Sequence, residues 1–126
     1  MPLANAQPVT FLFTRDRAQA RAFYADMLGL THTASDEYAE CFDLAGTPLR
    51  IVPIADHVPS PHTVLGWEVA DIAATATEMA AKGIAFEVYE GFGQDAGGIW
   101  SSPDGSTRIA WFLDPDGNNL SISQHG

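Results

Sequence analysis

The first half of the chain combines short strand-like runs with one amphipathic helix. The run 9–14 (VTFLFT) is rich in β-branched and aromatic residues, a composition that favours a strand. Asp16 has Gln19 three residues after it, a spacing typical of a helix N-cap, and Gly29 is a typical helix end. Between these positions, apolar residues recur at spacings of three and four and predict a face that a sheet must cover: Ala20, Phe23, Tyr24, Met27 and Leu28.

Three more strands are predicted after this helix, over 31–35, 39–44 and 48–53. An Ala-Gly pair at 45–46 separates the last two runs and indicates a tight turn. The predicted order of the first half is therefore strand, helix and three strands.

The second half repeats this order. The run 64–69 (VLGWEV) predicts a strand, Asp71 a second N-cap and Gly83 a second helix end. The predicted apolar face of the second helix consists of Ile72, Ala76, Met79 and Ala80. The remaining strands are expected over 84–89, 106–113 and 118–123, and Gly117 supplies the positive φ for the turn between the last two.

Equivalent positions of the two halves are related by one shift along the chain. Val9 and Asp16 correspond to Val64 and Asp71, a shift of 55 residues in both cases. We infer an internal duplication of a βαβββ unit within one domain, 1–126. Its first module spans about 8–53, its linker 54–63 and its second module about 64–124.

Charge and hydropathy exclude several kinds of partner. The 126 residues carry a formal net charge of -10, with a pI near 4.4, which is opposite in sign to a typical nucleic-acid binder. The sequence contains no apolar run of the roughly 18 residues needed to span a bilayer, and its first residues do not resemble a signal peptide. We therefore expect a cytoplasmic protein that binds neither nucleic acid nor membranes. Cys41, the one cysteine, is expected to be a buried, inert thiol.

Four motifs occur in an order that resembles a known family. They are FY-x-x-x-LGL at 23–30, EV-x-DI at 68–72, Gly83 and DPDGN at 114–118. With them, the chain from about Val9 to Gln124 resembles the vicinal oxygen chelate superfamily, which includes glyoxalase I, bleomycin-resistance proteins and extradiol dioxygenases. The resemblance implies an α+β fold in which two βαβββ modules form curved mixed sheets that enclose a cavity, and it implies a homodimer. It leaves open whether the modules pair within one chain or by domain swapping.

The resemblance also implies four metal-ligand positions, on the first and last strands of each module. In this chain they align to Val9, Arg50, Val64 and Ser121. Valine has no lone pair to donate, a hydroxyl is a weak ligand and a guanidinium repels cations. We therefore expect no metal cofactor; a divalent metal would imply that the alignment is wrong. His62 and Glu68 form the one partial substitute, as unusual metal ligands or as an acid and a base.

Strand alternation, combined with the resemblance, predicts which side chains line the cavity. The predicted ligand-binding residues are Phe11, Phe13, Arg50, Trp100, Trp111 and Ser121. Aromatic rings could stack on a planar ligand, or they could simply fill the core. Arg50 could pair with Glu68, bind a ligand carboxylate or extend to the rim of the cavity. The glycine-rich loop 91–102, which carries Trp100, could be a lid or an ordinary hairpin connection.

Three functions follow from these residues. The leading hypothesis is a metal-independent small-molecule binding protein that sequesters an aromatic or antibiotic-like ligand. The second is an enzyme of the same superfamily, a lyase, isomerase or dioxygenase, that uses His62 and Glu68. The third is a regulatory module whose cavity is closed by Phe11, Phe13 and Trp111. Whether the protein is an enzyme, and which ligand it takes, stay open at this stage.

Overall fold

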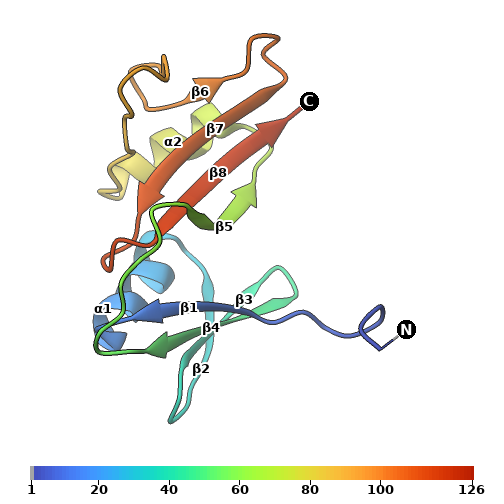
Figure 1. Cartoon of the computed structure of the whole chain (residues 1–126), viewed down its shortest axis with the longest axis vertical. Helices are drawn as coiled ribbons and strands as arrows, with labels where there is room; N and C mark the ends of the chain where they lie inside the picture. The colour runs from blue at the N-terminus through green and yellow to red at the C-terminus, as the bar shows by residue number, and fades with distance from the viewer. Residues whose placement is uncertain (1) are drawn as a thin grey trace. The chain divides into compact units, whose positions relative to one another are not determined.

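The computed structural model describes residues 2–126, and the chain divides into two compact units, Met1–Val58 and Pro59–Gly126. The elements of the first unit are β1 (Thr10–Thr14), α1 (Arg17–Ala22), the π-helical turn η1 (Phe23–Met27), β2 (Thr31–Ser35), β3 (Glu40–Leu44) and β4 (Thr47–Pro53) (Figure 1). The four strands form one mixed sheet in the order β1-β4-β3-β2, in which only β1 and β4 are parallel.

The core of the first unit lies between this sheet and the helix. Tyr24 is fully buried, and its ring centroid lies 5.1 Å from that of Phe23 and 6.0 Å from that of Phe42. Leu49 and Ile51 of β4 are also buried, at 0% and 1% exposure. The apolar stripe predicted for the helix therefore covers the sheet as expected.

The second unit repeats the topology. Its elements are β5 (Thr63–Glu68), α2 (Ile72–Ala81), β6 (Trp100–Ser101), β7 (Thr107–Leu113) and β8 (Asn119–His125) (Figure 1). The sheet order is β5-β8-β7-β6, with β5 and β8 parallel. Its core includes Ile72, Phe112 and Leu120, all fully buried, and Trp67 stacks on Phe112 at 6.3 Å. The predicted duplication of a βαβββ unit is confirmed.

The helix boundaries confirm the predicted caps. The Asp16 carboxylate accepts a hydrogen bond from the Gln19 backbone N–H at 3.1 Å, and Asp71 accepts one from the Ala74 N–H at 3.0 Å. Gly83 ends the second helix with φ 96°. The first helix differs from the prediction in one respect, because its last turn is π-helical rather than α-helical.

In the second unit, one strand prediction was wrong and one short strand was not predicted. The segment 84–89 forms only an isolated bridge, between Phe86 and Phe112, and β6 lies inside the stretch predicted as a loop. The backbone N–H of Glu87 still donates to the Trp111 carbonyl at 2.8 Å, so the segment follows one end of β7 without forming a ladder. Within residues 2–126, no helix is long and apolar enough to cross a membrane.

Candidate functional site

Each sheet has one side covered by its helix; we call the opposite side its open face. On β1, Leu12 and Thr14 are buried at 3% and 0% exposure, whereas Phe11 and Phe13 are 51% and 40% exposed. Arg50 is the register partner of Phe11 on β4 and therefore shares its face. The predicted alternation is thus confirmed, and it leaves two phenyl rings beside a guanidinium on the open face of the first sheet.

The open face of the second sheet has a small centre and an aromatic border. Gly66, Ser121 and Trp111 are register partners on three adjacent strands, and Trp100 is the partner of Ile109 in the next row. A Cβ added at Gly66 would lie only 2.6 Å from the Ser121 hydroxyl oxygen. The Ser121 hydroxyl therefore lies over Gly66, and we call the surface of these two small residues, next to Trp111 in the same row, the shelf. The row confirms that Trp111 and Ser121 share a face.

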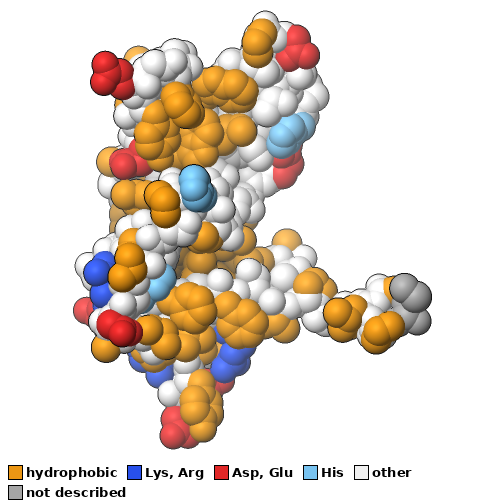
Figure 2. Space-filling model, in the orientation of Figure 1, with side chains coloured by type: hydrophobic (Ala, Val, Ile, Leu, Met, Phe, Trp, Pro, Cys, Tyr) orange, Lys and Arg blue, Asp and Glu red, His pale blue; other side chains and the backbone are white. Residues whose placement is uncertain are grey.

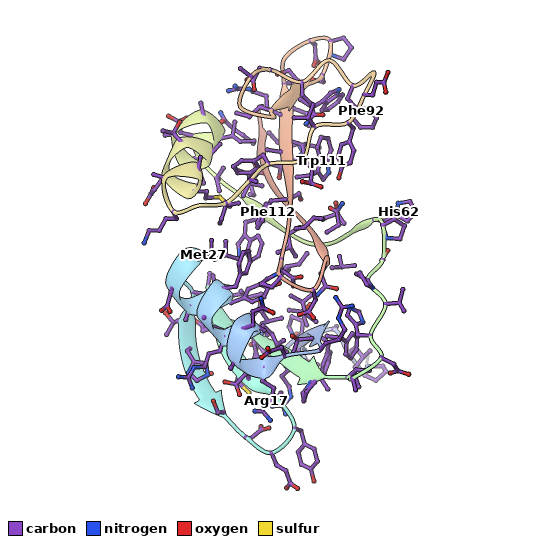
Figure 3. All side chains as sticks on the ribbon, turned by 90° about the vertical axis from the view of Figure 1, so that its left-hand side faces the viewer. Arg17, Met27, His62, Phe92, Trp111 and Phe112 are labelled. Atoms are coloured by element: carbon purple, nitrogen blue, oxygen red, sulfur yellow. The ribbon has the colours of Figure 1, made fainter. Side chains whose placement is uncertain are left out.

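Three aromatic rings meet at this shelf. The ring centroids of Tyr89, Phe92 and Trp111 lie 5.4–5.9 Å from one another. The Tyr89 hydroxyl accepts a hydrogen bond from the Asn119 side-chain amide at 3.2 Å. Figure 3 shows Phe92 and Trp111 on the side of the sheet opposite Phe112, and Figure 2 shows hydrophobic side chains gathered on this face. We call these three rings the aromatic cluster.

Sequence reasoning missed two members of this cluster. Tyr89 falls in the segment predicted as a strand, and Phe92 falls in the glycine-rich loop 91–102 that follows. Their signal was the glycine-rich composition of that loop, since a long connection can return side chains to a neighbouring face.

The loop that carries Phe92 is organised around one glutamine. The Gln94 amide donates to the carbonyls of Glu87 and Gly98 at 2.8 and 2.7 Å, and its oxygen accepts from the Tyr89 N–H at 2.7 Å. Asp95 accepts from the backbone N–H groups of Gly97 and Ile99, both at 2.9 Å. These hydrogen bonds order the connection between α2 and β6, which holds the rings of Tyr89 and Phe92 against Trp111.

Arg50 pairs with Asp36, a carboxylate of its own unit that was not among the three alternatives considered from the sequence. Its Nη2 donates to Asp36 Oδ2 at 3.1 Å and its Nη1 to Cys41 Sγ at 3.4 Å. Cys41 is the register partner of Arg50 on β3 and is partly exposed, so the expectation of a buried thiol was wrong.

His62 and Glu68 do not form a joint acid–base site. Glu68 accepts hydrogen bonds from the Ser123 hydroxyl at 2.9 Å and from the backbone and ring of His125 at 2.7 and 2.6 Å. The backbone bond from His125 lowers the pKa of Glu68 most, and the side-chain bonds lower it further. The six residues of β5 span about 20 Å, so His62, which directly precedes the strand, lies at the other end of it from Glu68.

The four positions that the resemblance assigns to a metal do not offer a ligand set. Val9 and Val64 are apolar and 43% and 45% exposed, and Arg50 is already paired with a carboxylate. Ser121 alone offers an oxygen, which is too little for a divalent ion. Among residues 2–126, no cluster of three or more histidine, cysteine, aspartate or glutamate side chains has the geometry to hold a metal ion.

The first unit also has a groove on its helix side, with a volume of about 640 Å³. It is lined by Arg17, Ala18, Arg21, Ala22, Ala25, Asp26, His32 and Glu40. The Glu40 carboxylate accepts hydrogen bonds from Arg17 Nε at 3.0 Å and from the Ser35 hydroxyl at 2.6 Å. It also lies 3.0 Å from His32 Nε2. Burial alone would raise the pKa of Glu40, but these hydrogen bonds lower it below 4.5. Because the groups bond to one another, we assign this network a structural role.

Two sequential βαβββ modules, each with a helix on one side of its sheet and an exposed face on the other, define a class of scaffold rather than an activity. The Glyoxalase/Bleomycin resistance protein/Dioxygenase superfamily model matches residues 6–122, and the chain belongs to this family. No curated protein sequence matches it significantly.

Solved structures share the fold at low sequence identity. A glyoxalase/bleomycin resistance protein/dioxygenase from Alicyclobacillus acidocaldarius is 18% identical, with 99% of this chain and 95% of that chain covered and a TM-score of 0.71. A lactoylglutathione lyase from Agrobacterium tumefaciens is 19% identical, with 97% of this chain and 95% of that chain covered and a TM-score of 0.71. TnmS3, an antibiotic binding protein from Streptomyces sp. CB03234, is 21% identical, covers 98% of both chains and has a TM-score of 0.72.

Proposed function

We propose that this protein binds a planar aromatic small molecule without a metal ion, at the aromatic cluster on the open face of the second sheet. The observation that carries the proposal is the meeting of Tyr89, Phe92 and Trp111 beside the shelf at Gly66 and Ser121. Phe92 is 50% exposed, so part of the aromatic cluster is accessible to a ligand from solvent.

The shape of the shelf suits a flat ring. Without a side chain at Gly66 and with only a hydroxymethyl group at Ser121, a ligand could approach the strands closely and lie against the Trp111 indole. Apolar burial contributes roughly 25 cal/mol per Å², and aromatic pairs add about 0.5–1.5 kcal/mol. The Ser121 hydroxyl and the Tyr89 hydroxyl provide polar groups that could orient the ligand.

The chemistry of the metal-ligand positions favours binding over catalysis. The relatives include both a lactoylglutathione lyase and an antibiotic-binding protein, so the fold alone does not decide. Val9, Arg50 and Val64 cannot coordinate a metal, and Glu68 is held by three hydrogen bonds that weaken it as a base. A sequestering protein needs neither group.

The test is calorimetric titration of the full chain with 2-naphthamide, a neutral planar probe, in buffer containing a chelator. We expect saturable binding and recovery of unchanged probe by chromatography. Trp111→Ala should weaken the affinity about fivefold or more, whereas Trp111→Phe should retain most of it. Tyr38→Ala is the control, because Tyr38 is an exposed aromatic residue outside the strands. Binding that is absent, or unchanged in Trp111→Ala, would contradict the proposal.

A further inference from the structure

We propose that Arg50 recognises the carboxylate of an aromatic ligand, and that Asp36 is an internal carboxylate that occupies its guanidinium until such a ligand displaces it. This inference goes beyond the proposed function, because its site lies on the open face of the first sheet and not at the aromatic cluster of the second unit. It also makes Asp36 a residue that determines specificity, because the strength of the internal pair sets the affinity for an anionic ligand.

Arg50 lies between an aromatic and a thiol side chain on the open face of the first sheet. On β4 its register partners are Phe11 on one side and Cys41 on the other, so all three share the open face of the first sheet. Its side chain is 31% exposed, and that of Asp36 is 43% exposed. A ligand can therefore reach the guanidinium from solvent while its ring lies against Phe11, which is 51% exposed.

Asp36 is held in place independently of Arg50. Its Oδ1 accepts hydrogen bonds from the backbone N–H groups of Tyr38 and Ala39, both at 2.8 Å. Arg17, from the helix, donates to the backbone carbonyls of Asp36 and Ala39 at 2.7 and 3.0 Å and so fixes the same turn. The bond from Tyr38 is the main reason that the pKa of Asp36 lies below its ordinary value. When a ligand arrives, the turn stays and the Arg50 side chain is the part that moves.

The internal pair already displays the chemistry that we assign to the ligand. A guanidinium presents a planar fork of donors that matches a carboxylate, but Arg50 contacts Asp36 through Nη2 alone, 3.1 Å from Oδ2 and 3.4 Å from Oδ1, while its Nη1 donates to Cys41 Sγ. An exposed ion pair of this kind is weak, typically worth 0.2–1 kcal/mol by coupling measurements, so a bidentate ligand can compete with it. Removing the charge at position 36 should therefore strengthen carboxylate binding about two- to fivefold.

The experiment compares 2-naphthoate with its neutral isostere 2-naphthamide in calorimetric titrations of the full chain at low salt. Asp36→Asn keeps an oxygen that can accept from Tyr38 and Ala39 but removes the charge. We expect it to tighten 2-naphthoate binding about two- to fivefold and to leave 2-naphthamide unchanged. Arg50→Gln should remove the preference for the carboxylate, with about a tenfold loss, and should abolish the effect of Asp36→Asn in the double variant.

Glu37→Gln is the matched control, because it changes the net charge equally and lies in the same turn. Equal tightening in Glu37→Gln would show a general charge effect and overturn the proposal. Binding of 2-naphthoate that depends on Trp111 but not on Arg50 would overturn it too, and would leave the proposed function intact. Failure of 2-naphthoate alone to bind would overturn this inference, and failure of both probes would remove the proposed function as well.

Discussion

The two modules share a backbone plan but differ on the helix side of their sheets. Arg17 and Ile72 are the first residues of α1 and α2, after the equivalent caps Asp16 and Asp71. In the first module, Arg17 bonds to the buried Glu40 of β3. At the equivalent positions the second module has Ile72 and Ala110, both fully buried: Ala110 pairs with Ile122 of β8 as Glu40 pairs with Ile51 of β4. The same contact surface is therefore polar in one module and apolar in the other.

The open faces of the two modules also differ. The equivalent rows are Phe11, Arg50 and Cys41 in the first module, and Gly66, Ser121 and Trp111 in the second. The row of the first module has a phenyl ring on its first strand and a guanidinium on the next. The row of the second module has glycine and serine at these positions, followed by an indole. Duplication thus preserved the strand register while the exposed side chains took different roles, one suited to an anion and one to a ring.

The largest expected effect breaks the polar network of the first module. Glu40→Ala leaves Arg17, His32 and Ser35 without their common partner, and should lower the free energy of unfolding by about 3 kcal/mol. Glu37→Ala, in the neighbouring exposed turn, should cost less than about 0.5 kcal/mol. Urea titration followed by circular dichroism measures both. Equal small losses would mean that the Glu40 network contributes little to the stability of the first module.

The second effect concerns the connection between α2 and β6, which is much longer than the equivalent connection in the first module. Gln94→Ala removes three hydrogen bonds and should destabilise the protein by about 2 kcal/mol. Amide exchange should accelerate at Tyr89, whose N–H bonds to Gln94, while exchange in the first module stays unchanged. Gln7→Ala, at an exposed residue, is the control. Unchanged exchange at Tyr89 would show that the loop does not depend on Gln94.

A third variant makes the second open face resemble the first. Gly66→Phe copies Phe11 and fills the shelf beside Trp111, so the affinity for 2-naphthamide should fall about tenfold. The loss of stability should stay within about 1–3 kcal/mol, because the neighbouring Ser121 hydroxyl is a flexible side-chain end. Retained affinity in a folded Gly66→Phe protein would place the ligand elsewhere.

The smallest effect is the acid dependence of the first module. Since hydrogen bonds lower the folded-state pKa of Glu40 below 4.5, its contribution is present above about pH 4.5 and is lost as the pH falls through the folded pKa. The stability advantage of the wild-type protein over Glu40→Gln should therefore shrink on acidification, by at most about 1.4 kcal/mol per pH unit. A constant difference between pH 6 and pH 3 would exclude this coupling.

Much of the fold could be predicted because its signals are local. Asp16 and Asp71 cap their helices through side-chain bonds within three residues, and strand alternation depends only on period two. The strand predicted at 84–89 failed because its pairing depends on what lies beside β7, which no local pattern records.

The candidate site was harder to predict for the same reason. The faces on which Phe11, Arg50, Trp111 and Ser121 lie could be predicted, because side chains alternate between the two faces along a strand. The partner of Arg50 was missed because Asp36 lies in a turn, where alternation gives no direction. Tyr89 and Phe92 were missed because a loop of irregular backbone brings them to Trp111.

The most direct test of the central claim is a two-dimensional ¹H–¹⁵N NMR titration of the labelled protein with 2-naphthamide, in the presence of a chelator. We expect saturable shifts centred on the Trp111 indole N–H and the backbone N–H groups of Gly66 and Ser121. Shifts confined to other parts of the protein, or shifts that appear only after a divalent metal is added, would contradict metal-independent binding at the aromatic cluster.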